Sequence, residues 1–246
     1  MERHKGSCKP LSKRLKAIYD CVPLHSGLTA DIGTDHGYLA VALATTGKSS
    51  YVVASDINRG PLNAAKEYVD ALQLGDKIDC RLGNGLGVLL PHEADTVLLC
   101  GMGGYLIKAL LLEAPYEPCV LVSQPQNGQD VLKQYIVHRG YYIEREELVE
   151  DMGHLYEIWL CRKDEKIRQC YDEIHVDSPL WLIGALLFVK GHPLMEKRLQ
   201  KLIHMENHVL HRMGWELHEH REYKEAVERK RKWEVLYERY CAKHHR

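Results

Sequence analysis

One segment of the chain combines glycines with side chains that could bind a charged ligand. It runs from Asp31 to Leu39, directly after an apolar, strand-like run at residues 28–32. Gly33 and Gly37 permit a tight turn and a close approach of the backbone to a ligand. A strand, a glycine-containing turn and a helix, in this order, are the context of a nucleotide-binding loop. An ordinary glycine-containing turn is the alternative explanation.

Asp35 stands between the two glycines, where a dinucleotide-binding fingerprint has glycine. A carboxylate at this place would repel a pyrophosphate but would attract a cation. S-adenosylmethionine (SAM) carries a sulfonium and an ammonium group and no phosphate, and its carboxylate could accept backbone N–H groups at the helix start. We therefore predict a SAM site, which includes Asp31, Gly33, Asp35, His36 and Gly37.

Two further polar turns follow the next two strand-like segments. Asp56 comes 23 residues after Gly33, a position from which a carboxylate accepts both ribose hydroxyls. Asn84 follows the third segment and could bond an adenine edge. Each residue alone also fits a helix cap or a plain turn, but ligands bind where parallel strands end, and all three turns fall there. The predicted cofactor site therefore also includes Asp56, Ile57, Asn84, Gly85 and Gly101.

The fourth and fifth strand-like segments end in turns that could face a substrate. The glycines from Gly101 to Gly104 expose backbone groups, and the Asn/Asp-Pro-Pro-aromatic loop of many amino-group methyltransferases is missing here. Gln124 and Gln126 offer amides that could read a base edge, although both turns could be plain turns. We predict that Met102, Gln124 and Gln126 bind substrate.

Short apolar runs alternate with helical patterns from residue 28 to about residue 162, which predicts an α/β fold with a doubly wound parallel sheet. The expected strands are residues 28–32, 51–57, 77–82, 96–101 and 119–123, and the expected helices are residues 37–45, 61–72, 105–112 and 128–138. Two further strands, 141–149 and 156–161, have no helix between them and should form an antiparallel edge hairpin. This ending is typical of class I, Rossmann-like SAM-dependent methyltransferases, whereas dinucleotide dehydrogenases usually add a sixth parallel strand.

After Pro179 the strand signals stop and two rows of apolar residues follow, with spacings of three and four that predict coiled-coil seams. The rows are Leu199, Ile203, Leu210, Met213 and Leu217, then Tyr223, Ala226, Trp233, Tyr237 and Tyr240. Gly214 and the polar residues 218–221 predict a reversal between them, hence an antiparallel helical hairpin; one long bent helix is the alternative. We predict a SAM-binding domain at residues 1–165 and a C-terminal coiled-coil hairpin at residues 166–246.

The net charge of −1 hides an uneven distribution: residues 1–16 carry +5, residues 17–195 carry −10 and residues 196–246 carry +4. Two basic ends on an acidic body favour a polyanionic partner, although solvated helix faces would give the same composition. A hydrophobic fraction of 45% and a charged fraction of 27% are ordinary for a globular protein.

Neither a secretory signal nor a membrane span is expected, because the first 17 residues are polar and the longest apolar stretch has ten residues. The eight cysteines show no CxxC spacing. This argues against a disulfide scaffold and a zinc site, so we expect no metal and a reducing, cytoplasmic location.

Taken together, these residues resemble the bacterial tRNA (adenine-N1)-methyltransferase family, TrmK. The matching segments run nearly end to end: Leu11 to Leu15, Asp31 to Leu39, Asp56-Ile57 with Gly60-Pro61, Gly83 to Leu86, Gly101 to Gly104, Gln124 to Gln126 and Leu155 to Ile158. The chain departs from the family at Asn84, where Asp is common, and at Gln126, where Asn is common. Both residues keep the ability to form hydrogen bonds.

The resemblance implies a Rossmann-like SAM domain with a coiled-coil hairpin, and methyl transfer from SAM to N1 of adenosine 22 in the D-loop of tRNA. Adenine N1 has a lone pair, so catalysis could be mostly positioning. Asp35 is the candidate that stabilises the cationic product, unless it binds the SAM ammonium instead. Tyr38 either stacks on the base or is a core residue. The basic residues expected to contact tRNA are Lys13, Arg14, Lys16, Lys197, Arg198 and Lys201.

Two other functions stay open on the sequence. The chain could be a SAM-dependent methyltransferase of a small molecule, or a non-catalytic coiled-coil interaction module that binds no SAM. The oligomeric state is unknown, and a monomer is plausible.

Overall fold

The computed structural model describes residues 8–244. Residues 1–7, part of the basic N-terminal segment, lie outside the described residues. The chain divides into two compact units, and the division falls between Asp172 and Glu173. Within residues 8–244, no helix is long and apolar enough to cross a bilayer. The same residues place no group of three or more His, Cys, Asp or Glu side chains where it could hold a metal ion.

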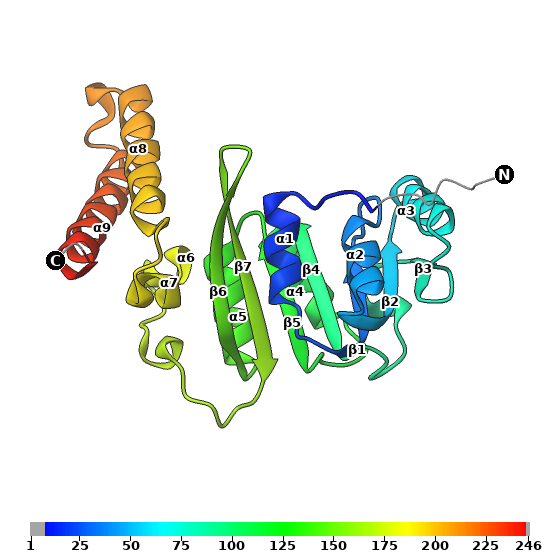
Figure 1. Ribbon diagram of the computed structural model, residues 1–246. Helices are drawn as coiled ribbons and strands as arrows, with labels where there is room; N and C mark the ends of the chain where they lie inside the picture. The colour runs from blue at the N-terminus through cyan, green and yellow to red at the C-terminus, as the bar shows by residue number, and fades with distance from the viewer. Residues whose placement is uncertain (1–7, 245–246) are drawn as a thin grey trace. The chain divides into compact units, whose positions relative to one another are not determined.

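The first unit is built on a seven-stranded sheet (Figure 1). Its strands are β1 (Ser26–Ile32), β2 (Ser49–Asp56), β3 (Ile78–Leu82), β4 (Thr96–Met102), β5 (Val120–Pro125), β6 (Tyr141–Asp151) and β7 (His154–Lys163). They are ordered β3-β2-β1-β4-β5-β7-β6. Strands β1 to β5 are parallel, and β7 is antiparallel to both β5 and β6. The predicted parallel sheet with an antiparallel edge hairpin is confirmed.

Helices cover both faces of this sheet: α1 (Lys13–Cys21), α2 (Tyr38–Thr46), α3 (Arg59–Ala71), α4 (Gly104–Leu112) and α5 (Gln129–His138). Figure 1 shows α1 and α2 in front of the sheet and α4 and α5 behind it. Ile18 of α1, Leu43 of α2 and Leu98 of β4 are buried in one apolar cluster. Helix α1 was not predicted. It begins after Ser12, whose Oγ accepts the backbone N–H of Leu15 at 3.3 Å, as in an N-cap.

The edge hairpin turns in two residues, so both of its strands are longer than the predicted 141–149 and 156–161. Strand β6 continues to Asp151 and β7 begins at His154. Met152 and Gly153 between them have φ angles of 49° and 77°. Two successive left-handed residues match the twist of a tight hairpin, and this turn leaves residues 150–151 to extend β6 and residues 154–155 to extend β7.

A buried ionic cluster ties this hairpin to α5 and to the chain that follows it. Lys133 of α5 forms ion pairs with Glu146 at 2.8 Å and with Glu157, and all three side chains are at most 1% exposed. The hydroxyl of Tyr171 donates to Glu146 at 2.7 Å. Residues beyond the expected boundary at 165 are thereby fastened to the sheet, and the first compact unit extends to Asp172.

The second unit contains the short helices α6 (Leu180–Ile183) and α7 (Ala185–Lys190), which were not predicted, and the long helices α8 (Met195–Met213) and α9 (Arg221–His244). A short 3₁₀ turn, η3 (Trp215–Leu217), lies between the long helices. Gln200 Nε2 donates to the Tyr237 hydroxyl at 3.1 Å, and Glu206 pairs with Arg229 at 2.8 Å. The later residue of α8 therefore pairs with the earlier residue of α9, so the two helices run in opposite directions. This confirms the predicted antiparallel helical hairpin.

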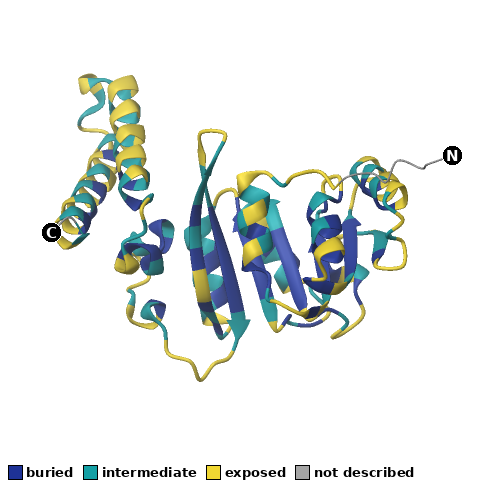
Figure 2. Ribbon diagram, viewed as in Figure 1, coloured by how far each residue is buried: buried dark blue, intermediate teal, exposed yellow. Residues whose placement is uncertain are grey.

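Fewer residues of α8 and α9 are buried than the two predicted apolar rows contain. Figure 2 shows that α8 and α9 are exposed along much of their length. The buried residues of these helices are Met195, Leu199, Ala226, Trp233, Leu236 and Tyr240. Leu236, which the pattern did not include, is buried, while Tyr237 is half-buried and contacts Gln200 of α8. Leu217 lies in η3 rather than in α8.

Candidate functional site

The loop between β1 and α2 makes a tight turn where the parallel strands end. Gly33 and Gly37 have φ angles of 81° and 68°, which glycine adopts at little cost. A Cβ atom on Gly33 would lie 2.5 Å from Cε of Met102, and one on Gly37 would lie 3.1 Å from Cβ of Ala65. The N–H of Gly33 donates to the carbonyl of Ser55 at 2.8 Å. The two glycines therefore allow the loop to lie closely against β2, α3 and the end of β4.

This loop holds two carboxyl groups in different environments. Asp31 is buried and accepts a hydrogen bond of 2.7 Å from Oγ1 of Thr34. Burial raises the pKa of Asp31 to about 6; the Thr34 hydrogen bond opposes the rise, and the negative charge of Asp56 adds to it. The side chain of Asp35 is 77% exposed and lies 3.2 Å from Nε2 of His36.

A cavity of about 320 Å³ opens where β2, β3 and β4 end. Asp56 lies on its wall and accepts the backbone N–H of Asn58 at 2.7 Å, which fixes the carboxylate there. Gly85 has a φ of 52°, and a Cβ atom on it would lie 2.5 Å from Leu110. Asn84, the residue before Gly85 in the chain, also lines this cavity. The apolar side of this cavity is formed by Ile57, Met102, Leu106 and Leu110.

A second cavity, of about 360 Å³, adjoins the first, because Gly33, Cys100 and Gly101 line both. Its charged lining residues are Arg14, Asp31 and Asp35. The other lining residues are Leu15, Ile18, Thr34, Tyr38, Leu39 and Gln126. Together the two cavities could hold an elongated ligand with a polar, zwitterionic end on the α1 side.

Arg14 reaches this second cavity from α1 and is held there by three contacts. Its Nη1 donates to Oε1 of Gln124 at 3.1 Å. Its guanidinium carbon lies 5.3 Å from the ring centre of Tyr156, and its backbone N–H donates to Asp151 at 3.0 Å. The guanidinium is thus a positioned cation that lines the second cavity, and its predicted contact to tRNA stays a prediction. Its neighbour Lys13 is exposed and lines neither cavity.

Tyr38 lies in the second cavity as part of a group of rings. Its ring stacks on His36 at 5.6 Å and 27°, and meets the edge of Tyr68 at 5.6 Å. Lys9 Nζ donates to the Tyr38 hydroxyl at 3.2 Å. The ring is half-buried, which leaves part of its surface toward the cavity.

The predicted substrate residues on β4 and β5 divide into two kinds. Gln124 is fully buried, its Nε2 donates to the carbonyl of Pro125 at 3.1 Å, and its Oε1 accepts from Arg14. No surface of it is left for a base. Gln126 is exposed and lines the second cavity, and its N–H donates to the carbonyl of Met102 at 2.8 Å. Met102 lines the first cavity.

The structure brings most predicted site residues to one place. Of the predicted cofactor residues, those that line a cavity are Asp31, Gly33, Asp35, Asp56, Ile57, Asn84, Gly85 and Gly101. His36 and Gly37 shape the loop but lie outside both linings. Leu15 and Ile18 also line the second cavity, and the sequence pattern did not predict them because α1 was not predicted. The signal available was Ser12 as a helix cap before an amphipathic stretch.

The chain is similar to known methyltransferases. A sequence model described as "Methyltransferase domain" matches residues 11–159. The tRNA (adenine(22)-N(1))-methyltransferase of Bacillus subtilis is 30% identical over 201 residues, which cover 80% of this chain and 83% of that protein.

Solved structures are similar over nearly the whole chain. The B. subtilis M1A22 tRNA methyltransferase TrmK has a TM-score of 0.80 at 26% identity, covering 94% of this chain and 100% of that chain. M. capricolum TrmK, solved with S-adenosyl-homocysteine, has a TM-score of 0.80 at 25% identity, covering 93% of this chain and 98% of that chain. A Streptococcus pneumoniae protein solved with SAM has a TM-score of 0.78 at 25% identity, covering 93% and 100%. By its sequence and its fold, the chain belongs to the tRNA (adenine(22)-N(1))-methyltransferase family, TrmK.

Proposed function

We propose that this chain transfers the methyl group of SAM to N1 of adenosine 22 in tRNA. The observation that carries the proposal is the pair of adjoining cavities at the ends of the parallel strands, whose polar groups match the two ends of SAM. The B. subtilis relative is named for this reaction, and similar structures contain SAM or S-adenosyl-homocysteine.

The residues present fit SAM across both cavities. In the first cavity, the Asp56 carboxylate would accept hydrogen bonds from the ribose hydroxyls, and Asn84 would bond the adenine edge. The apolar wall at Ile57 and Leu106 suits the flat base. In the second cavity, Asp31 and Asp35 carry the negative charge that an ammonium and a sulfonium require.

The chemistry proposed for the protein is positioning and charge stabilisation. When bound, SAM supplies an electrophilic methyl group. Adenine N1 already has a lone pair, so no side chain has to remove a proton, and the rate comes from alignment. The methylated base is cationic, and the exposed carboxylate of Asp35 would stabilise the charge that develops on it. Tyr38, in the same cavity, would stack on the base once it has left its pair.

The charge of the two units supports tRNA as the partner. Residues 1–172 carry a net charge of −4 and residues 173–246 carry +3, with nine histidines in the second set. An RNA backbone is therefore expected to contact the helical unit. Of the predicted contacts there, Arg198 is used internally, since its Nη2 donates to the carbonyl of Leu182 at 2.6 Å. Lys201 is exposed on α8.

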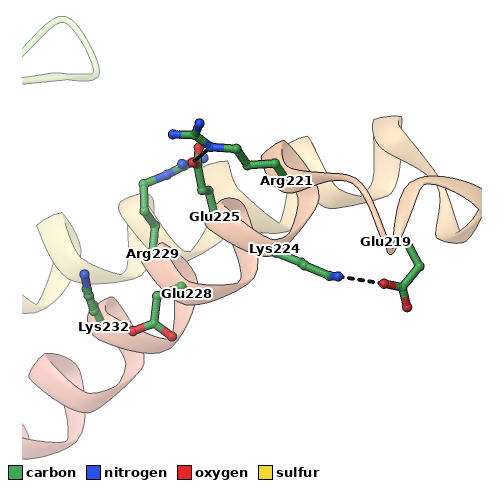
Figure 3. A pocket seen from close by; sticks show the side chains of 7 residues that line it. All are labelled: Glu219, Arg221, Lys224, Glu225, Glu228, Arg229 and Lys232. Carbon is green, nitrogen blue, oxygen red and sulfur yellow. Dashed lines mark hydrogen bonds and ion pairs between the residues drawn. The ribbon is translucent and has the colours of Figure 1, made fainter.

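A shallow groove of about 600 Å³ along α9 adds further candidate phosphate contacts (Figure 3). Its cations are Arg221, Lys224, Arg229 and Lys232, and its acids are Glu219, Glu225 and Glu228. Lys224 pairs with Glu219 and Arg221 with Glu225, each at 2.6 Å. Such exposed pairs are weak, so phosphate groups could displace the carboxylates.

Mass spectrometry of nucleosides tests the proposal. The protein is incubated with SAM and unmodified transcribed tRNA, and the digested tRNA is searched for 1-methyladenosine, which we expect to find. A methyltransferase of small molecules would bind SAM but leave the tRNA unmethylated. A coiled-coil interaction module would bind no SAM, and either outcome would contradict the proposal.

A further inference from the structure

One tryptophan differs from the other three in its surroundings. Trp159, Trp181 and Trp233 are 0%, 3% and 6% exposed, whereas Trp215 is 73% exposed. Trp215 opens η3, the connection between α8 and α9. Exposing a large aromatic ring to water is unfavourable, so a ring kept at the end of a helical hairpin calls for an explanation.

Trp215 is held in place by a second ring. The imidazole of His218 stacks on it with ring centres 4.6 Å apart and planes 2° apart. Nδ1 of His218 lies 2.8 Å from the carbonyl oxygen of Trp215, which fixes the pair. The ring of Tyr223 meets Trp215 at 6.4 Å and 90°. The indole is therefore ordered before any partner arrives, with a large part of its surface toward solvent.

The exposed residues next to this stack in the chain are polar, whereas Met213 and Leu217 are half-buried. Arg212, Glu216, Glu219 and His220 are all exposed. A docking site for a protein would need a contiguous apolar patch of a few hundred Å², and one flat ring amid charged residues does not supply it. A single planar ring of suitable size, such as a nucleobase, fits this platform instead.

We propose that the Trp215–His218 stack receives an unpaired base of the tRNA substrate. RNA-binding proteins commonly read unpaired bases by stacking them on aromatic side chains. The groove of Figure 3 begins at Glu219 and Arg221, one to three residues beyond His218, and offers cations for the adjacent phosphates. The inference rests on the proposed function, because it takes tRNA as the partner, but it adds a second point of recognition in the helical unit.

Tryptophan fluorescence gives a direct test with the full chain. Since the other three tryptophans are buried, acrylamide, which leaves the ionic strength unchanged, should quench mainly Trp215. The difference between the wild-type protein and Trp215→Phe isolates its signal. We expect tRNA to protect Trp215 from quenching.

The variant Trp215→Ala should weaken tRNA binding roughly 5- to 150-fold, the effect of one lost base stack. The salt dependence of binding should stay the same, because no phosphate contact is lost. SAM affinity should not change, and Trp215→Phe should recover part of the loss. Met205→Ala, which truncates another exposed apolar residue of the same unit (55% exposed), is the matched control and should bind tRNA normally.

Several outcomes would overturn the inference. If acrylamide quenches Trp215 fluorescence equally with and without bound tRNA, the base-stacking inference is contradicted, while the proposed methylation is unaffected. Protection that rises with protein concentration in the absence of tRNA would show that a second copy of the chain covers the ring. A chain that binds no tRNA at all would contradict both the inference and the proposed function.

Discussion

Arg14 and Gln124 are joined by a hydrogen bond of 3.1 Å from Nη1 to Oε1, between residues 110 positions apart. Gln124 is fully buried, so it can serve as a fixed acceptor that aims the guanidinium. Arg14 is also the one basic residue among those that line the second cavity. A SAM carboxylate placed in that cavity would find its cationic partner there.

We therefore predict that Arg14→Gln weakens SAM binding by roughly 10- to 150-fold, which is the usual effect of losing hydrogen bonds to a charged group. Decarboxylated SAM, which lacks only the carboxylate, should bind the variant and the wild-type protein about equally. Calorimetry with both ligands measures this difference. Lys16→Gln, an exposed cation on the same helix, is the matched control and should leave both affinities unchanged.

Equal losses for SAM and decarboxylated SAM would show that Arg14 only supports α1. Normal SAM affinity combined with weaker tRNA binding would instead return Arg14 to the tRNA contact that the sequence suggested.

Asp56 gives a second prediction. Its carboxylate is fixed at the wall of the first cavity by the N–H of Asn58. Removing this acceptor from two ribose hydroxyls in Asp56→Ala should weaken SAM binding by about 1.5–3 kcal/mol, or roughly 10- to 150-fold. Unchanged affinity in calorimetry would remove Asp56 from the site.

Asp31 makes SAM binding depend on pH. Burial raises its pKa to about 6 in the free protein, so the carboxyl becomes protonated as the pH falls through 6. A cationic ligand favours the ionised form, and a protonated Asp31 must lose its proton on binding. SAM affinity should therefore be highest above pH 7 and fall as the pH is lowered to 5, by at most about tenfold per pH unit.

Calorimetry in two buffers with different ionisation enthalpies should show this proton release near pH 6. Asp31→Asn, which has no titrating group at that position, should bind SAM more weakly and with little pH dependence. A wild-type affinity that stays flat between pH 5 and 7.5 would contradict a role for the ionised carboxylate.

A variant of Asp35 tests whether this carboxylate acts in catalysis or only in cofactor binding. If its charge acts on the methylated base, Asp35→Asn should lower turnover even when SAM is saturating. We expect a loss of roughly tenfold, less than the ~100- to 1000-fold of a buried charge-stabilising group, because this side chain is 77% exposed and screened by solvent. Asp76→Asn, an exposed carboxylate in the loop before β3, is the control. Full turnover of Asp35→Asn at saturating SAM would make Asp35 a cofactor contact only.

The parts of the site that the sequence predicted are those set by local order along the chain. Gly33, Asp56 and Asn84 each follow a strand, and parallel strands all end at one edge, so alternation alone brings these residues together. The same alternation predicted the sheet and its edge hairpin.

The parts that were missed depend on contacts between distant residues. The sequence does not show that α1 covers the sheet or that Arg14 points into the cavity, because both depend on partners such as Gln124 and Tyr156. Gln124 was expected to face a substrate, but β5 is a central strand that is buried on both faces, and the Gln124 side chain is buried beneath Arg14 of α1. The contact of Tyr171 with Glu146 likewise extends the first unit beyond the predicted boundary.

In the helical hairpin, the predicted seven-residue repeat holds along α9, where Ala226, Trp233 and Tyr240 are all buried. The repeat did not predict the burial of Leu236, and Tyr237 is half-buried because its hydroxyl takes part in hydrogen bonds with α8.

The central claim is that this chain methylates N1 of adenosine 22 of tRNA, and the most direct measurement compares two substrates. Unmodified tRNA and an otherwise identical tRNA with guanosine at position 22 are incubated with the protein and SAM, and methylation is located by mass spectrometry of nuclease fragments. We predict 1-methyladenosine at position 22 of the first tRNA and none in the second. Equal methylation of both tRNAs, or methylation at another position of the first, would contradict the account.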